Sequence, residues 1–152
     1  MINDLPLPVT NDPVDHGFWA SALQSQLVVQ RCSGCRLLRF PPRPMCPKCQ
    51  SSDSGWQVMS GRGKVWSFAT PASPLLPAFE ALTPYVTAVV SLDEHEDLRV
   101  VGPLLLAPGG DIQGVRADQL SIGQAVSIEF KRLADDVALP CWVLEPSGRQ
   151  GE

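Results

Sequence analysis

Residues 31–50 of this chain read RCSGCRLLRFPPRPMCPKCQ. The stretch holds two CxxC knuckles, Cys32 with Cys35 and Cys46 with Cys49, and ten residues lie between them. Each knuckle is a tight turn that directs two thiols at one point, so two knuckles complete a tetrahedral four-cysteine site. Four thiolates leave no open coordination position, and the proline-rich segment has little core of its own. We therefore expect one structural zinc ion per chain, which these four cysteines bind and which holds the segment together.

Other interpretations of the same cysteines stay open. A redox pair or a disulfide would use the same residues, although a cytosolic chain keeps its thiols reduced. Iron in a rubredoxin-like site is a further alternative, and strong absorption of visible light would reveal it. The fifth cysteine, Cys141, lies in the apolar run around Trp142, and we expect it to be a buried small hydrophobic residue.

The residues before the knuckles predict an extended arm and then a short helix. Residues 1–15 hold three prolines and no apolar period, so we expect an extended arm there. Asp15 is the expected N-cap, and the apolar residues after it recur at three- and four-residue steps, which is typical of one face of a helix of about three turns. These apolar residues are Phe18, Trp19, Ala22, Leu23 and Leu27. Residues 16–55 are therefore expected to form a helix and a zinc ribbon.

After the ribbon the pattern changes to short strands. Val58 begins the first run, which passes a Gly-Arg-Gly turn at residues 61–63. Two hairpins are expected to follow, the first around an acidic turn at residues 93–97 and the second around residues 134–136. The five predicted strands are residues 58–68, 86–92, 98–106, 125–133 and 137–144.

The connections between these strands are uneven in length. A proline-rich loop follows the first strand, and a helical turn is expected within residues 112–120. Five antiparallel strands with such connections fit the small barrel of the OB-fold. The fold class is thus mainly β, with a five-stranded OB-fold barrel over residues 56–145 and a flexible tail over 146–152.

Composition limits the class of protein. Of the 152 residues, 44% are hydrophobic and only 18% are charged, which is the reverse of the balance that keeps chains disordered. No apolar run approaches the ~18 residues that cross a bilayer, and the first residues lack the basic and apolar regions of a secretory leader. We therefore expect a cytoplasmic protein with no membrane segment.

Charge is unevenly distributed along the chain. The net charge of −4 disfavours a protein that binds nucleic acid mainly by neutralising phosphates. Residues 31–64, however, hold seven basic residues against one acid, a formal charge of +6 that leaves −10 for the rest. This basic segment could present a positive surface to an anionic ligand or partner, or it could be only a solvated face.

No reaction centre can be assembled from the sequence. The two histidines, His16 and His95, lie before the helix and in an acidic turn, and the adjacent carboxylates Asp135 and Asp136 lie in another turn. Nucleophile-elbow, P-loop, dinucleotide-binding and HExxH patterns are all missing from the sequence. A zinc-knuckle protein of this kind is better interpreted as a binding or scaffold subunit.

Several motifs in this chain resemble one family closely. They are FW at 18–19, LVVQRCSGC at 27–35, RFPPRPMCPKC at 39–49 and WQVMSGRGKVWSF at 56–68, with looser agreement at 84–92 and 122–126. The family comprises bacterial and archaeal proteins in which a rubredoxin-like zinc ribbon precedes an OB-fold, long catalogued as domain of unknown function thirty-five. The resemblance extends from Phe18 to about Leu144, and its zinc-ribbon half is specific. Residues 101–111 depart from the pattern, being longer and richer in proline than the third strand of the family.

The resemblance implies a non-catalytic accessory subunit. Members of the family accompany thiolase-superfamily enzymes, acyl-CoA hydratases and steroid side-chain aldolases. A partner enzyme and an acyl-CoA ligand, in lipid or steroid side-chain metabolism, are therefore implied. CoA carries phosphates and an adenine ring, which basic and aromatic side chains of the basic segment could bind. The expected ligand contacts are Arg39, Phe40, Arg43, Arg62, Lys64 and Trp66, although each could equally be a surface residue or a partner contact.

Two rival functions remain to be weighed. OB-folds and zinc ribbons both recur in proteins that bind nucleic acid, so a nucleic-acid-binding module is the alternative. Against it, the predicted strands from Val65 to Leu144 hold few basic residues, and Tyr85 is the only tyrosine. A free-standing enzyme is the third possibility, and it lacks an acid–base or nucleophile constellation.

Overall fold

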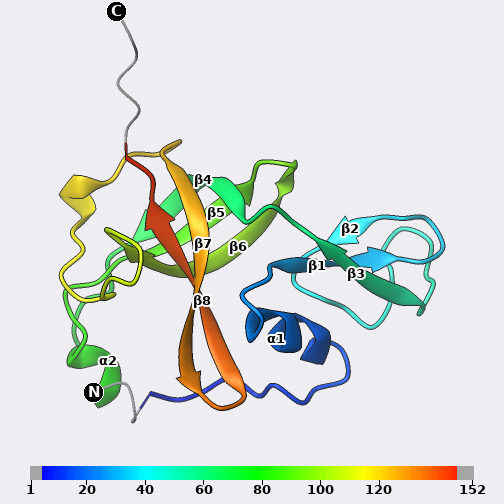
Figure 1. Cartoon of the computed structure of the whole chain (residues 1–152), viewed down its shortest axis with the longest axis horizontal. Coiled ribbons are helices and arrows are strands. Elements are labelled where there is room, and N and C mark those ends of the chain that lie inside the picture. The colour runs from blue at the N-terminus through cyan, green and yellow to red at the C-terminus, as the bar shows by residue number, and fades with distance from the viewer. Residues whose placement is uncertain (1–4, 147–152) are drawn as a thin grey trace, which may run out of the picture.

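The computed structural model describes residues 5–146. These residues form a small sheet at one end and a closed barrel at the other, with helix α1 (His16–Ala22) between them (Figure 1). The arrangement confirms the predicted fold, an N-terminal helix and ribbon before a five-stranded OB-fold barrel. The start of the predicted arm, residues 1–4, and most of the predicted tail, residues 147–152, lie outside the described residues. Within residues 5–146, no helix is long and apolar enough to cross a membrane.

Helix α1 is shorter than the apolar period predicts. Asp15 precedes its first residue as expected, but the Asp15 carboxylate accepts a hydrogen bond from the Trp19 indole (3.4 Å) and none from the helix backbone. Ser25 has a left-handed φ of 57°, which turns the chain out of the helix and toward the sheet. Leu27, predicted on the helix face, therefore lies beyond the helix, where it is buried.

The ribbon sheet has three antiparallel strands in the order β2-β1-β3. They are β1 (Val28–Cys32), β2 (Leu38–Arg39) and β3 (Ser54–Val58). The prediction that Val58 begins the first barrel strand is wrong, because Val58 ends β3 and pairs with Val28. The chain separates the two sheets only at Gly61, whose φ of 78° is a conformation that glycine adopts readily. The ribbon sheet thus extends across residue 56.

The barrel closes in the strand order β4-β5-β6-β8-β7, with β7 pairing back to β4. Its strands are β4 (Arg62–Ala69), β5 (Thr87–Leu92), β6 (His95–Leu105), β7 (Ala125–Ala134) and β8 (Val137–Leu144). Four pairings are antiparallel, as predicted, but β6 and β8 run parallel where Leu104 faces Trp142. The long connection from β6 to β7 brings β8 back in the direction of β6, so this pair closes the barrel.

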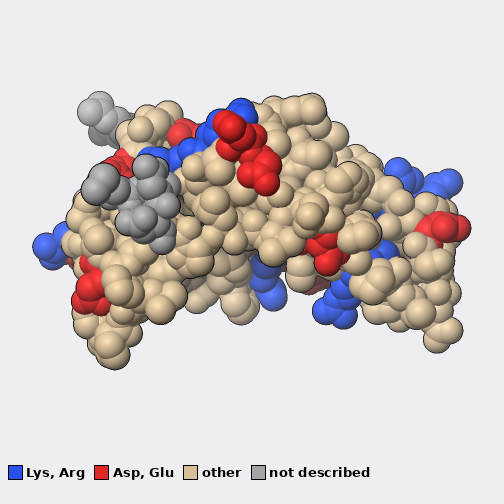
Figure 2. Space-filling view, turned by 90° about the horizontal axis from the view of Figure 1, so that it is seen from below, with Lys and Arg blue, Asp and Glu red and all other residues tan. Residues whose placement is uncertain are grey.

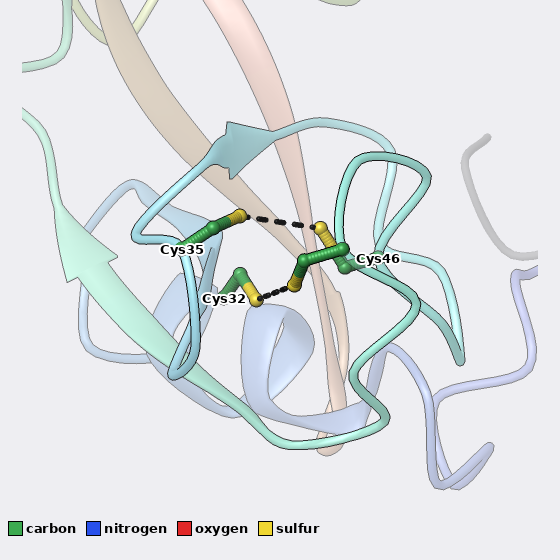
Figure 3. A group of neighbouring side chains, drawn as sticks. Cys32, Cys35 and Cys46 are labelled. Atoms are coloured by element: carbon green, nitrogen blue, oxygen red, sulfur yellow. Dashed lines mark hydrogen bonds between the residues drawn. The ribbon is translucent and has the colours of Figure 1, made fainter.

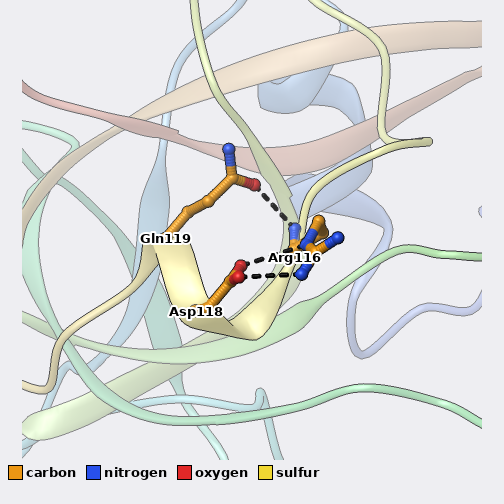
Figure 4. Close-up of polar contacts among 3 residues, drawn as sticks. All are labelled: Arg116, Asp118 and Gln119. Atoms are coloured by element: carbon orange, nitrogen blue, oxygen red, sulfur yellow. Dashed lines mark hydrogen bonds and ion pairs between the residues drawn. The ribbon is translucent and has the colours of Figure 1, made fainter.

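Two predicted connections are more compact than expected. The acidic turn between β5 and β6 is shorter than residues 93–97, because β6 already begins at His95. The helical turn within 112–120 is a single 3-10 turn, Ala117–Gln119. The Arg116 side chain forms an ion pair with Asp118 (2.8 Å) and closes this turn (Figure 4). The proline-rich loop carries one short helix, α2 (Pro77–Glu80).

One apolar core joins the ribbon end of the molecule to the barrel. Its buried members include Phe18, Leu27, Val28, Val29, Val65, Val90, Val100, Leu104, Val126 and Trp142. Because α1 and β1 contribute to the same core as the barrel strands, the ribbon is fixed against the barrel. On the other side, the arm reaches the β7–β8 turn, where the Thr10 hydroxyl donates to Asp136 (3.1 Å).

Candidate metal centre and barrel groove

The four knuckle cysteines converge at the end of the ribbon. Their sulfur atoms all lie within 4.8 Å of one another, with 3.5 Å between Cys32 and Cys49 and 3.6 Å between Cys35 and Cys46. Figure 3 shows three of the side chains turned toward a common centre. These separations are far longer than the roughly 2.05 Å of a disulfide. They are close to the ~3.8 Å edge of a tetrahedron with metal–sulfur bonds of ~2.3 Å, so the four thiols fit a metal ion such as zinc.

The two knuckles have the same backbone geometry. The N–H of Arg36 donates to the Cys32 carbonyl (3.1 Å), and the N–H of Gln50 donates to the Cys46 carbonyl (2.9 Å). Arg36 and Gln50 both have left-handed φ angles, 65° and 61°. Each knuckle thus ends in the same sharp turn, which holds its two thiols on one side and presents both pairs to one ion.

Backbone donors favour thiolates at one position of each knuckle. The backbone N–H of Cys35 lowers the pKa of Cys32 to about 6, and the backbone N–H of Cys49 likewise lowers the pKa of Cys46. At Cys35 the N–H of Leu37 lowers the pKa, but burial and the neighbouring thiols outweigh it and raise the pKa to about 11. Metal ions bind the thiolate form, so Cys32 and Cys46 are poised as the first ligands.

Arg39, a predicted ligand contact, is buried inside the ribbon. Its side chain is only 7% exposed, and its Nε donates to the Gln30 amide oxygen (2.6 Å). Its Nη2 donates to the Arg43 carbonyl (3.3 Å), while the Arg43 N–H donates to the same Gln30 oxygen (2.8 Å). The guanidinium therefore ties β1 to the loop that leads into the second knuckle.

The other predicted contacts divide between the two ends of the molecule. The Phe40 ring packs against Phe18, with 5.4 Å between ring centroids, whereas the Arg43 side chain is exposed. On β4, Arg62 lies 3.5 Å from Glu145 in an exposed ion pair. Lys64 and Trp66 line one groove on the outer face of the barrel. The structure thus brings Lys64 and Trp66 together, and it leaves Arg39, Phe40 and Arg43 on the ribbon.

The barrel groove has a volume of about 500 Å³ and mixed charge. Its lining includes the cations Lys64 and Arg99, the carboxylates of Asp93, Glu96 and Asp97, and the apolar side chains of Trp66 and Ile122. The strand register explains the arrangement, because Lys64 pairs with Ser91 on β5 and Ser91 pairs with Arg99 on β6. A small serine between two long cationic side chains leaves a hollow across the three strands.

Sequence reasoning missed Arg99, the residue that completes this groove. Its guanidinium carbon lies 4.0 Å from the centroid of the Trp66 ring, in a cation–π stack. A β-bulge in β4 between Val65 and Ser67 makes Trp66 the extra residue, so Trp66 points outward while Phe68 still packs on the core. The outward alternation of Asp97, Arg99 and Val101 is visible in the sequence, but the pairing across β5 is not.

Cys141 is unreactive by position, which confirms its prediction as a buried residue. Its side chain is fully buried in β8, and burial raises the pKa of its thiol to about 12. In the metal-loaded protein, we expect iodoacetamide at about pH 8 to leave Cys141 unmodified, because almost none of it is thiolate. Peptide mass spectrometry measures this, with the denatured protein as the control in which Cys141 is modified. Rapid labelling of Cys141 in the folded protein would contradict its burial.

Comparison with family models matches both halves of the chain. Residues 19–54 match the model described as ChsH2, rubredoxin-like zinc ribbon domain, and residues 56–131 match ChsH2, C-terminal OB-fold domain. Among solved structures, the chain is similar to one titled Ltp2-ChsH2(DUF35) aldolase. That match has a TM-score of 0.74 and 32% identity, and it covers 90% of this chain and 98% of the other.

Two curated relatives give the same picture in different lengths. A probable enoyl-CoA hydratase alpha subunit of Thermomonospora curvata is 36% identical over 148 residues, which are 97% of this chain but only 41% of the relative. A DUF35 domain-containing scaffold protein of Methanocaldococcus jannaschii is 30% identical over 112 residues, covering 72% of this chain and 71% of the relative. The chain therefore spans less than half of the hydratase subunit and most of the scaffold protein.

Proposed function

The chain belongs to the DUF35 family of ChsH2-type accessory subunits with a zinc ribbon and an OB-fold, and on that premise we propose that it binds a thiolase-superfamily enzyme. In that complex it contributes to binding an acyl-CoA, and the partner performs the chemistry. The match to the aldolase chain carries this proposal, because this chain aligns with 98% of that chain. The hydratase relative, whose name marks it as one subunit of an enzyme, supports the same role.

The proposed contact with acyl-CoA is the basic surface of the ribbon. Exposed cations gather there, at the right-hand end of the molecule in Figure 2. They are Arg31, Arg36, Arg43 and Lys48. Arginine and lysine bind phosphate groups through charge-assisted hydrogen bonds, and CoA carries several phosphates. Of the predicted contacts, Arg43 belongs to this surface, and Arg62, which is also exposed, is the barrel residue that extends it.

The test begins with a tagged full-length chain expressed in its native host. We expect a thiolase-superfamily enzyme to co-purify with it in stoichiometric amount. Calorimetric titration of CoA into the isolated complex then tests the ligand, and Arg43→Glu should weaken binding at least tenfold. Arg132→Glu, a charge reversal of an exposed arginine at the far end of β7, is the matched control.

Two results would overturn this proposal. The first is a chain that purifies with no enzyme subunit under conditions that keep its metal bound. The second is a salt-dependent affinity for a short single-stranded oligonucleotide that exceeds the affinity for CoA, since this would assign the chain to the nucleic-acid-binding class. If no heat is released on adding CoA to either the chain or its complex, the ligand half of the proposal is removed and the partner half stands.

A further inference from the structure

The outer face of β4, β5 and β6 exposes an unusual group of side chains. Three large apolar residues are more than half exposed on or beside it, namely Trp66 (52%), Val101 (54%) and Ile122 (64%). Val101 and Arg99 point outward from the same strand, and Trp66 reaches Arg99 across β5. We call Lys64, Trp66, Arg99, Val101 and Ile122 the barrel patch. Single exposed apolar residues are ordinary, but a group of them marks an interaction site.

Arg99 and Lys64 keep their charges available in this patch. Among the described residues, neither side chain takes part in an ion pair or a hydrogen bond to another side chain. Stacking on Trp66 restricts the Arg99 side chain while the N–H groups at the edge of its guanidinium remain free to donate. Tryptophan and arginine in such a setting are the residues that most often carry the binding energy of protein interfaces.

The charges of the groove decide what class of ligand it fits. Asp93, Glu96 and Asp97 line the groove together with Lys64 and Arg99, so carboxylates outnumber cations. A polyphosphate or a nucleic acid strand would meet repulsion from the three carboxylates. A protein surface can instead place a carboxylate at Arg99, a basic side chain at the β5–β6 turn and an apolar side chain on Trp66.

We propose that the barrel patch is the surface on which the partner enzyme subunit docks. This inference rests on the proposed function, because it names the face that the accessory subunit uses. The partner presents an apolar side chain, which packs on Trp66 and Ile122, and a neighbouring carboxylate, which accepts two hydrogen bonds from the Arg99 guanidinium. The basic ribbon surface then remains free for the acyl-CoA.

Four variants of the full-length, metal-loaded chain test this docking surface. Trp66→Ala and Arg99→Glu alter the patch. Leu76→Ala alters an apolar residue that is 62% exposed in the proline-rich loop, and Arg132→Glu reverses an exposed charge on β7, so these two are the matched controls. The probe is the enzyme subunit that co-purifies with the native chain, and calorimetry measures its dissociation constant with each variant.

We expect Trp66→Ala and Arg99→Glu each to weaken the complex by about 30-fold or more, as interface hot spots do. Arg99→Glu should also reduce the salt dependence of the association rate, which a merely structural role would not change. Leu76→Ala and Arg132→Glu should bind within about threefold of the native chain, since surface substitutions away from an interface have small effects.

Several outcomes would overturn the docking surface. If both patch variants bind the partner as tightly as the native chain does, the face is wrong while the proposed function stands. A chain that dimerises on its own, and loses the dimer in Trp66→Ala, would assign the patch to a second copy. Binding of a free nucleotide that Arg99→Glu abolishes, with partner affinity unchanged, would assign it to a small ligand. A native chain with no enzyme partner would overturn both proposals together.

Discussion

Removal of the metal is expected to unfold the ribbon while the barrel stays folded. A strong chelator, or the substitution Cys32→Ser or Cys46→Ser, should abolish protection from hydrogen exchange across residues 33–53. The strands of the barrel should keep most of their protection. Hydrogen exchange read by mass spectrometry, on native and metal-free chains side by side, measures both regions in one experiment.

The reason lies in how little the ribbon buries. Between Cys32 and Ser54, the structure buries only Cys32, Arg39 and Cys46, and two of these are metal ligands. Binding of zinc by four cysteine thiolates is worth roughly 10–16 kcal/mol at neutral pH in small zinc domains. That is as large as the whole stability of a typical domain, about 5–15 kcal/mol. The loop between the knuckles cannot replace such a contribution with its own contacts.

The barrel is expected to survive because its core does not depend on the knuckles. Phe18, Leu27, Val28 and Val29 pack with barrel residues and lie before the first knuckle. Cys141→Ser is the control, since Cys141 lies in β8 away from the knuckles, and it should retain one equivalent of zinc per chain by elemental analysis. A colourless protein excludes iron at this site. Retention of metal and of ribbon protection in Cys32→Ser would contradict the four-cysteine site.

The ribbon shows how far sequence reasoning reaches and where it stops. The CxxC spacing predicts that four thiols meet, because each knuckle is a local turn whose geometry needs no distant contact. The fate of Arg39 is different, because its burial depends on Gln30 in a neighbouring strand. A basic residue in a basic segment is therefore predicted at the surface, and only strand pairing shows that it holds the loop from inside.

The barrel gives the same lesson for strands and for the groove. Alternation and turn residues predict all five strands, since both are properties of neighbouring residues. They do not show that Val58 pairs with Val28, nor that Arg99 stacks on Trp66, because the partners lie 30 or more residues apart in sequence. The bulge at Trp66 also hides from pattern reading, because it shifts the alternation by one residue without a glycine to mark it.

Trp142→Ala is expected to be the most destabilising single substitution in the barrel. Trp142 is fully buried in β8 at the point where the parallel pair closes the barrel, and its indole N–H donates to the Val100 carbonyl (3.2 Å). Gly102 lets β6 approach there, because a Cβ at Gly102 would lie 2.5 Å from the Pro140 carbonyl oxygen and 3.2 Å from Trp142. An indole in such a tightly packed site cannot be removed without leaving a cavity.

The size of this effect separates the two exposed and buried tryptophans. Trp142→Ala should cost about 3–5 kcal/mol of the free energy of unfolding, which lowers the melting temperature of a chain of this size by roughly 6–20 °C. Trp142→Phe should cost less, because it keeps most of the apolar volume and loses mainly the hydrogen bond. Urea unfolding of the metal-loaded protein measures all three chains.

Trp66→Ala is the matched control, and the comparison bears directly on the docking surface. Trp66 is 52% exposed, so its removal should cost about 1 kcal/mol or less through loss of the Arg99 stack. If Trp66→Ala is stable but fails to bind the partner, the loss belongs to the interface and cannot be attributed to unfolding. If Trp142→Ala unfolds no more easily than the native chain, Trp142 does not anchor the closure of the barrel.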